Sequence, residues 1–269
     1  MIDITPHSTQ RKKGPWWAIG GFGALALIEL LISANIRVLQ WAPASSIWLR
    51  NHEFAFQEVL KFLRAGLWLL VTYYLAGSGS PRAFVQEVQL ACPPTRQAFY
   101  GMALAAAIGG MDLFAANRRW TAPHPASSWF YQRGQLGLFL FVTFVTTVGP
   151  FYQETVFRGF LYPSLRRSWP PILSKALAIC MTAYFSFGVL TRSAASAACL
   201  CALWWLLCEI KEKTGNTWNC VLASASYNLI VTNYRPVQMS VAAIVILSLV
   251  IRKMRGNSPR APSRACAAD

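Results

Sequence analysis

The sequence predicts an all-α membrane protein, a polytopic bundle of about eight transmembrane helices. Two features of the composition support this fold class: 55% of the residues are hydrophobic and only 13% are charged, whereas about a quarter are charged in a typical soluble domain. The third observation is a series of apolar stretches along the chain. Several of them have the length of about 20 residues that an α-helix needs to cross a bilayer.

Three of these stretches lie in the first half of the chain. The stretch that follows the basic N-terminal tail has no small-residue cleavage site after it, so we interpret it as an anchor rather than a cleaved signal. Lys61 and Arg64 lie near one end of the second stretch, from which long side chains reach the lipid headgroups. The predicted tail is 1–15, and the spans of the N-terminal region 16–133 are 16–36, 59–77 and 98–117.

The fourth predicted span, 134–152, opens a core region that covers residues 134–232. Pro150 predicts a bend there, because proline lacks the backbone N–H of a regular helix and its ring crowds the preceding turn. We therefore expect a bent helix from residue 134 to about residue 166. The remaining predicted spans are 171–190, 193–210, 216–232 and 237–251, the last within a segment 233–251 that precedes a basic, disordered tail, 252–269.

The net charge of +15 fits a membrane protein. Lys and Arg residues accumulate on the cytoplasmic side of membrane proteins, and eight spans with both termini in the cytoplasm leave most of them on that side. No basic segment interleaved with aromatic residues indicates a nucleic-acid-binding module. The sequence therefore predicts an integral membrane protein that contacts membrane lipids and no nucleic acid.

An acid and a base lie one helical turn apart within the core region. Glu154 and Arg158 are separated by four residues, so on a helix they share one face and neutralise each other. A charge within hydrocarbon is costly and persists when it is paired, solvated or used. This pair is therefore a candidate for a functional or an organising role.

The run QETVFRGFL, from Gln153 to Leu161, resembles the first motif of the CPBP family of intramembrane proteases, the CAAX-protease, bacteriocin-processing and Abi-like enzymes. That motif reads Glu-Glu-x-x-x-Arg, so Gln153 stands where the family has its first glutamate. Residues 187–191, FGVLT, are similar to the second motif, Phe-x-x-x-His, and Thr191 replaces its histidine.

The third motif of the family is a Thr-Gly-Ser-x-Trp segment followed by His-x-x-x-Asn on the next helix. Residues 214–218, TGNTW, resemble the first part, and Ser224 and Asn228 stand at the His and Asn positions. The order and spacing of the three motifs identify residues 134–232 as a CPBP-like core. The resemblance also implies a bacterial inner membrane as the location.

The resemblance implies the chemistry of a glutamic intramembrane endopeptidase. In the family a carboxylate and a histidine activate water, and a histidine and an asparagine stabilise the oxyanion. Gln153, Thr191 and Ser224 replace three of these groups, and none of the three side chains has a basic site near neutral pH. The retained motif positions are Glu154, Arg158 and Asn228.

Other catalytic sets find little support in the sequence. The three histidines, His7, His52 and His124, all lie outside the core region, so we predict neither a zinc site nor a cofactor. A serine nucleophile needs a nearby base, and residues 216–232 contain no lysine. The seven cysteines lack the spacing of metal ligands.

Three further acids lie in or near the predicted spans. For Glu29 and Asp112 two interpretations remain open: a role in ion or proton transfer, or an ion pair with an arginine of the bundle, for which Arg158 is one candidate. Glu209 ends the sixth predicted span beside Lys211 and Lys213, and we interpret it as an interfacial acid.

We predict a pseudoprotease, a membrane protein that binds a membrane-anchored peptide or protein partner without cutting it. A family resemblance predicts the fold more firmly than the activity. One alternative is an active intramembrane peptidase that uses Glu154 with an altered residue set. A second alternative is a small ion-coupled transporter that uses Glu29, Asp112 and Glu154.

Overall fold

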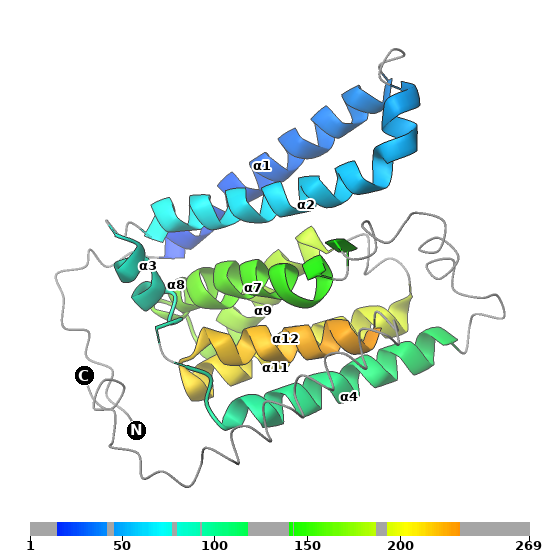
Figure 1. Cartoon of the computed structure of the whole chain (residues 1–269). Helices are drawn as coiled ribbons and strands as arrows, with labels where there is room; N and C mark the ends of the chain where they lie inside the picture. The colour runs from blue at the N-terminus through cyan, green and yellow to red at the C-terminus, as the bar shows by residue number, and fades with distance from the viewer. Residues whose placement is uncertain are drawn as a thin grey trace, which may run out of the picture.

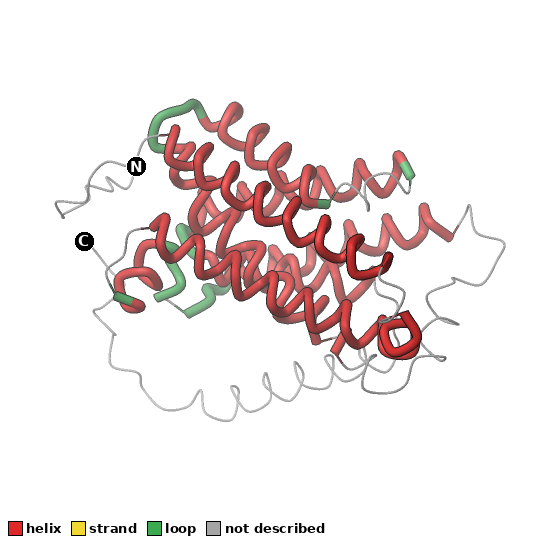
Figure 2. Tube along the Cα trace, turned by 90° about the horizontal axis from the view of Figure 1, so that it is seen from above, coloured by secondary structure: helices red, strands yellow, loops and turns green. Residues whose placement is uncertain are grey.

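The computed structural model describes residues 15–41, 46–76, 80–91, 93–117, 140–141, 143–186 and 193–231. These residues form helices joined by turns, and no strand occurs among them (Figure 2). The all-α prediction is confirmed for this part of the chain. Thr191, the predicted span 237–251, residues 1–14 of the predicted N-terminal tail and the predicted C-terminal tail lie outside it.

The first two helices form an antiparallel hairpin along one side of the molecule (Figure 1). Helix α1 (Pro15–Trp41) begins at a proline, a residue whose fixed backbone angle suits the first helical position. Helix α2 (Ser46–Ala76) begins before the predicted span 59–77. Near the ends of the two helices the Trp17 indole donates a hydrogen bond of 2.6 Å to the Leu75 carbonyl.

One continuous helical path crosses the middle of the molecule. It consists of the π-helix η1 (Phe144–Val148), helix α7 (Gly149–Glu154), the π-helix η2 (Thr155–Leu161) and helix α8 (Tyr162–Arg166). The expected helix through Pro150 to about residue 166 is therefore confirmed over the described residues 143–166. The Gly149 and Tyr162 amides donate to carbonyls five residues earlier, at Phe144 and Phe157.

The two wide turns have a common local cause. Each π-helix ends two residues before a proline, Pro150 or Pro163. A proline ring crowds the carbonyl four residues earlier and donates no hydrogen bond, and a wider i→i−5 turn relieves that contact without ending the helix. The motif helix α7 thus lies between two irregular turns, which are frequent at functional sites.

The other side of the molecule contains α4 (Gln97–Asn117), α11 (Ala194–Thr214) and α12 (Thr217–Val231), with α9 (Pro171–Phe185) beside the central path (Figure 1). Ser193 caps α11, because its hydroxyl accepts the Ser196 amide at 3.0 Å. Gly215 ends α11 in the left-handed conformation with φ +63°. This cap reverses the chain into α12 within two residues.

Two hydrophobic clusters follow this layering. The first joins α1, α2, the central path and α9 through residues that include Leu25, Trp68, Phe157, Leu161 and Ala178. The second joins α4, α11 and α12 through residues that include Ala105, Leu203, Leu207, Ala223 and Tyr227. The central path therefore lies between two packed groups of helices.

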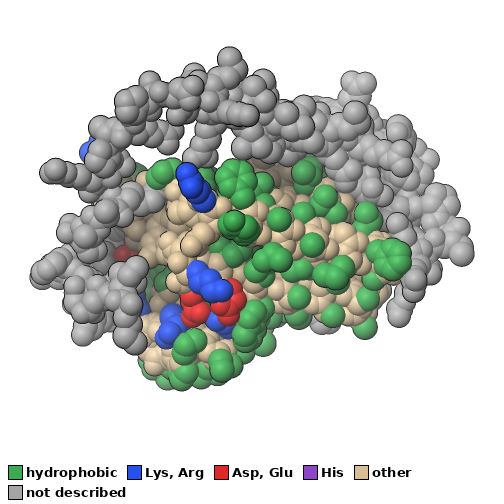
Figure 3. Space-filling view, turned by 90° about the horizontal axis from the view of Figure 1, so that it is seen from below, with side chains coloured by type: hydrophobic (Ala, Val, Ile, Leu, Met, Phe, Trp, Pro, Cys, Tyr) green, Lys and Arg blue, Asp and Glu red, His purple; other side chains and the backbone are tan. Residues whose placement is uncertain are grey.

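Three of the described helices contain segments long and apolar enough to cross a membrane, Val59–Ala76, Gln97–Ala115 and Ala194–Thr214, and two shorter apolar helices cover Ile19–Leu30 and Pro171–Phe185. Hydrophobic side chains spread over the face shown in Figure 3, with acidic and basic side chains gathered at one end. Only 22% of the Val59–Ala76 segment is buried, so much of its apolar surface suits lipid. The protein is thus an integral membrane protein, and the number of eight spans stays a prediction.

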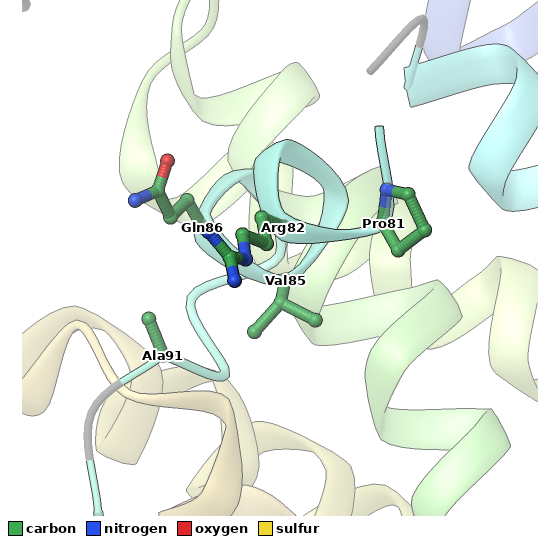
Figure 4. Close-up of a pocket in the computed structure, with 5 residues that line it drawn as sticks. All are labelled: Pro81, Arg82, Val85, Gln86 and Ala91. Atoms are coloured by element: carbon green, nitrogen blue, oxygen red, sulfur yellow. The ribbon is translucent and has the colours of Figure 1, made fainter. Parts of the chain in front are cut away.

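A short helix, α3 (Pro81–Glu87), precedes α4. Ser80 caps it by accepting the Ala83 amide at 3.2 Å. A shallow surface pocket beside this helix is lined by Pro81, Arg82, Val85, Gln86 and Ala91 (Figure 4). None of these residues belongs to the three predicted motifs.

Candidate functional site

The acid and the arginine of the first motif form the predicted ion pair. Arg158 Nε lies 3.4 Å from Glu154 Oε2, and the two side chains are 0% and 2% exposed. Helical spacing brings them together across the junction of α7 and η2. Two buried charges are costly when they are unpaired. The ion pair therefore has to form for α7 and η2 to lie in the interior.

Arg158 also joins three helical elements. Its guanidinium donates to Thr182 Oγ1 of α9 at 3.4 Å and to the Trp204 carbonyl of α11 at 3.3 Å. The five donors of an arginine suit this kind of multiple contact. Arg158 therefore anchors η2 to both neighbouring helices in addition to neutralising Glu154.

The third motif reaches the first through Ser224. This residue is 5% exposed on α12, and it contributes to the electrostatic surroundings of the Glu154 carboxylate. Helix α12 packs directly on α7 and on both π-helices. The structure therefore brings Ser224 to the ion pair, although these residues are 70 positions apart in the sequence.

Asn228 lies one helical turn after Ser224 on α12. Its side-chain amide donates to the Val145 carbonyl of η1 at 3.0 Å. This contact ties α12 to the π-helical turn that precedes α7. The retained asparagine thus has a structural contact here, and its role as an oxyanion donor stays a prediction.

Gln153 points to a different neighbour than Glu154 does. Its amide donates to the Tyr152 hydroxyl at 3.4 Å, and Arg64 of α2 donates to the same oxygen at 3.4 Å. The substituted position is therefore connected to the α1–α2 hairpin. Thr191, the third substituted position, lies outside the described residues.

The start of α12 binds a segment that the sequence analysis assigned to no motif. The Asn216 amide donates to the Pro93 carbonyl at 2.8 Å, and the Trp218 indole donates to the Leu90 carbonyl at 3.0 Å. Asn219 exchanges two hydrogen bonds with Thr95. The predicted span 216–232 begins with polar side chains, and these were the sequence feature that could have indicated a contact with residues 88–95.

Thr217 lies at the centre of the same contact. Its hydroxyl donates to the Val88 carbonyl and accepts from the buried Lys211 ammonium at 2.6 Å. A Cβ on Gly159 of η2 would meet Val88 Cβ at 3.1 Å and the Val88 carbonyl at 3.2 Å. Gly159 is therefore needed for the close approach of residue 88 to η2.

Neither Glu29 nor Asp112 pairs with Arg158. Glu29 Oε1 of α1 lies 2.8 Å from Arg64 Nη1 of α2, so Arg64 contacts a carboxylate of the bundle rather than only extending to headgroups. Asp112 accepts hydrogen bonds from Ser196 at 2.6 Å and from the Tyr227 hydroxyl. The candidate pairing of these acids with Arg158 was wrong, because each has a nearer partner on an adjacent helix.

Glu209 belongs to a cluster of four charged residues at one end of the bundle, together with Lys175, Glu212 and Arg166. Its carboxylate pairs with Lys175 of α9, which also contacts Glu212 at 2.7 Å. Arg166 of α8 lies 3.1 Å from Glu212. Lys211 points away from this cluster, since its ammonium donates to Thr217.

Metal binding has no visible basis in the described part of the chain, where no group of three His, Cys, Asp or Glu side chains gathers. The described cysteines Cys180, Cys199, Cys201, Cys208 and Cys220 are free. The prediction of no metal and no cofactor stays a prediction for the whole chain.

Fold and site together define a helical membrane protein with a buried acid–arginine pair on its central helix. Comparison with protein families gives the particular class: residues 135–230 match the model of the Rce1-like family, the type II CAAX prenyl endopeptidases. The resemblance to CAAX-type intramembrane proteases is therefore confirmed for this segment. Comparison with curated proteins and with solved structures found no similar protein.

Proposed function

We propose that this protein is a non-proteolytic relative of the CAAX-type intramembrane endopeptidases and that it binds a membrane-anchored peptide or protein partner. Its location in this proposal is the inner membrane of a bacterium, with both termini in the cytoplasm. The match over residues 135–230 supports the family background. The loss of proteolysis is argued from the residues at the motif positions.

One observation carries the proposal: the segment that resembles the protease contains no histidine, and Gln153 stands in place of the first glutamate. Activation of water requires a group that accepts a proton near the working pH. The side chains of Gln153 and Ser224 have no such site. The same segment keeps the groups that organise its fold, since Arg158 contacts α9 and α11.

Glu154 is the remaining carboxylate on which an active enzyme would depend. It is 2% exposed and paired with Arg158. A general base has to reach the proton that it abstracts, directly or through one water. The ion pair and the burial favour an organising role for Glu154 over the role of a base.

The transporter alternative receives less support from the contacts. Its three acids have separate partners: Glu29 pairs with Arg64, Asp112 with two hydroxyls, and Glu154 with Arg158. A transport pathway needs acidic groups that share a route through the bundle. These contacts instead describe three local links between helices.

Binding without cleavage is the direct test. The full-length protein in lipid nanodiscs is mixed with a dansyl-labelled, farnesylated peptide that ends in a free carboxylate. We expect saturable binding that an unlabelled peptide competes for, and an intact peptide by mass spectrometry after prolonged incubation. Empty nanodiscs correct for partition into lipid. Absence of saturable binding, or release of the C-terminal residues, would contradict the proposal.

A further inference from the structure

We propose that the pocket beside α3 binds the headgroup of an anionic phospholipid, with Arg82 as the cation that holds the phosphate. The pocket is lined by Pro81, Arg82, Val85, Gln86 and Ala91, and its volume is about 330 Å³. This volume is at the lower end of the range of ligand sites in proteins, so it suits a headgroup rather than a whole lipid. The lipid site does not depend on the peptide binding proposed above.

Helix α3 is fixed to the rest of the molecule by its inner face. The Phe84 ring lies edge-on to the Tyr73 ring of α2 at 5.5 Å, and Glu87 pairs with Arg167 at 3.1 Å. Val88, directly after the helix, is fully buried and lies against η2. The opposite face of α3 is exposed and forms the pocket, so a ligand can reach it.

The pocket lies where apolar segments of the bundle end. Helix α3 begins at Pro81, shortly after the end of the apolar segment Val59–Ala76. The residues that follow α3 accept a hydrogen bond from Trp218 of α12, a helix that begins directly after the apolar segment Ala194–Thr214. Figure 1 accordingly shows α3 at the end of the molecule where α2 ends and α12 begins. The headgroups of a surrounding bilayer are expected at this level.

Arg82 supplies a positive charge that no described residue neutralises. By contrast, Arg166 and Arg167 pair with Glu212 and Glu87. Arg82 is exposed at the pocket, so its N–H donors are available to a ligand. A phosphate accepts two of these donors side by side, and such a charge-assisted contact is stronger than one between neutral groups.

The other lining residues favour a lipid over a soluble phosphate. Gln86 follows Arg82 by one helical turn, and Figure 4 shows the two side chains on the same side of α3. The Gln86 amide is a further N–H donor for a phosphate oxygen. Pro81, Val85 and Ala91 are apolar and match the glycerol backbone and the first methylene groups of the acyl chains. A soluble phosphate gains nothing from these apolar side chains.

The charge of the pocket selects among phospholipids. The phosphate is the only charged group of phosphatidylglycerol, so its full charge is available to Arg82. Phosphatidylethanolamine carries an ammonium group beside its phosphate, and this group repels the guanidinium. Basic pockets at the cytoplasmic ends of transmembrane helices are typical sites of anionic headgroups.

The test measures lipid binding to the full-length, detergent-solubilised protein by native mass spectrometry. We expect Arg82→Gln to weaken the binding of the first phosphatidylglycerol molecule about tenfold, the loss of one charge-assisted contact. Val85→Glu, which places a negative charge in the pocket at a 37% exposed position, should weaken it by a similar factor. Arg96→Gln is the matched control, because Arg96 is exposed between the same two predicted spans and lies outside the pocket. This control should bind as wild type.

Equal affinities of wild type, Arg82→Gln and Val85→Glu would overturn the lipid site, and so would an equal loss in Arg82→Gln and Arg96→Gln. Thermal unfolding provides a second measurement. Without added lipid, Arg82→Gln should unfold at the wild-type temperature, and a lower temperature would assign the arginine a structural role and contradict the site. Phosphatidylglycerol should raise the unfolding temperature of wild type more than that of Arg82→Gln.

Three comparisons distinguish an anionic lipid from other ligands. Phosphatidylethanolamine and soluble glycerol phosphate should each bind more weakly than phosphatidylglycerol, and equal affinity of either would refute the proposal. In phosphatidylcholine nanodiscs, Arg82→Gln should bind the dansyl-labelled, farnesylated peptide as wild type does. A tenfold loss there would assign the pocket to the terminal carboxylate of the peptide instead. A wild type that binds phosphatidylglycerol through Arg82 but binds no peptide would support the lipid site and contradict the proposed function.

Discussion

Arg158 is the side chain on which the interior of the motif segment depends most. It neutralises Glu154 and donates to Thr182 and to the Trp204 carbonyl. Each of these groups belongs to a different helical element. A buried charge that loses its only counter-ion is far more costly than the replacement of the complete pair by uncharged side chains.

Arg158→Met should therefore lower the free energy of unfolding by about 3–5 kcal/mol. The double variant Glu154→Gln, Arg158→Met should recover much of that loss, because the unpaired charge is gone. Unfolding of the detergent-solubilised protein in SDS measures both effects. Arg82→Met, at an exposed position of α3, is the control and should change stability by less than about 0.5 kcal/mol. Equal stability of Arg158→Met and wild type would contradict this role.

Gly159→Ala tests whether the close approach of residue 88 requires a position without a side chain. Gly159→Ala places a Cβ 3.1 Å from Val88 Cβ and 3.2 Å from the Val88 carbonyl, so the backbone of residue 88 has to move. We expect a loss of about 1–3 kcal/mol, measured by the same unfolding titration. Gly110→Ala on α4, where nothing lies within 4 Å, should be neutral or stabilising by about 0.5–1 kcal/mol. The same effect at both glycines would refute the close approach.

At the scale of elements, the segment 88–95 and the start of α12 behave as one unit. Four consecutive residues of α12 and its approach, Asn216 to Asn219, make hydrogen bonds to that segment. The segment in turn packs on η2 through Val88. The third motif therefore holds the segment that follows α3 against η2.

Thr217→Val tests this docking. The variant removes the hydroxyl between Lys211 and the Val88 carbonyl and leaves both buried groups with fewer partners. We predict a loss of about 1–3 kcal/mol in the free energy of unfolding. Thr72→Val is the matched control, because the equally buried Thr72 hydroxyl donates only within its own helix, to the Trp68 carbonyl. Similar losses in the two variants would argue against a docking role.

Local patterns predicted some elements and contacts, whereas long-range contacts had no local signal. The Glu154–Arg158 pair follows from a spacing of four residues, and the helix through Pro150 follows from continuous apolar sequence. The start of α2 at Ser46 escaped prediction because residues 50–57 are rich in polar side chains. The Glu29–Arg64 pair and the docking of residues 88–95 join segments far apart in sequence. The π-helical form of the turns before Pro150 and Pro163 escaped prediction, because a proline within a helix is also compatible with a simple kink.

At the scale of the whole molecule, the central path from η1 to α8 connects two helical groups with separate hydrophobic clusters. The α1–α2 hairpin belongs to the first cluster, and α4, α11 and α12 form the second. The motif residues within the described part of the chain lie where the two groups meet. A binding protein with this arrangement can keep the protease fold while it lacks the groups that activate water.

The proposed orientation is tested by reporter fusions. With both termini in the cytoplasm, green fluorescent protein at the C-terminus should fluoresce and alkaline phosphatase at the same place should be inactive. A phosphatase fusion after residue 117, which follows the third predicted span, should be active. Active phosphatase at the C-terminus would contradict the proposed orientation.

The absence of proteolysis is the central claim, and a cleavage assay tests it most directly. Wild type, Glu154→Gln and the triple variant Gln153→Glu, Thr191→His, Ser224→His are incubated in nanodiscs with a farnesylated peptide, beside an active type II CAAX prenyl endopeptidase as positive control. We predict that wild type releases no more product than Glu154→Gln, and that among the three forms of this protein only the triple variant is able to gain activity. Turnover by the wild type that Glu154→Gln abolishes would contradict the account.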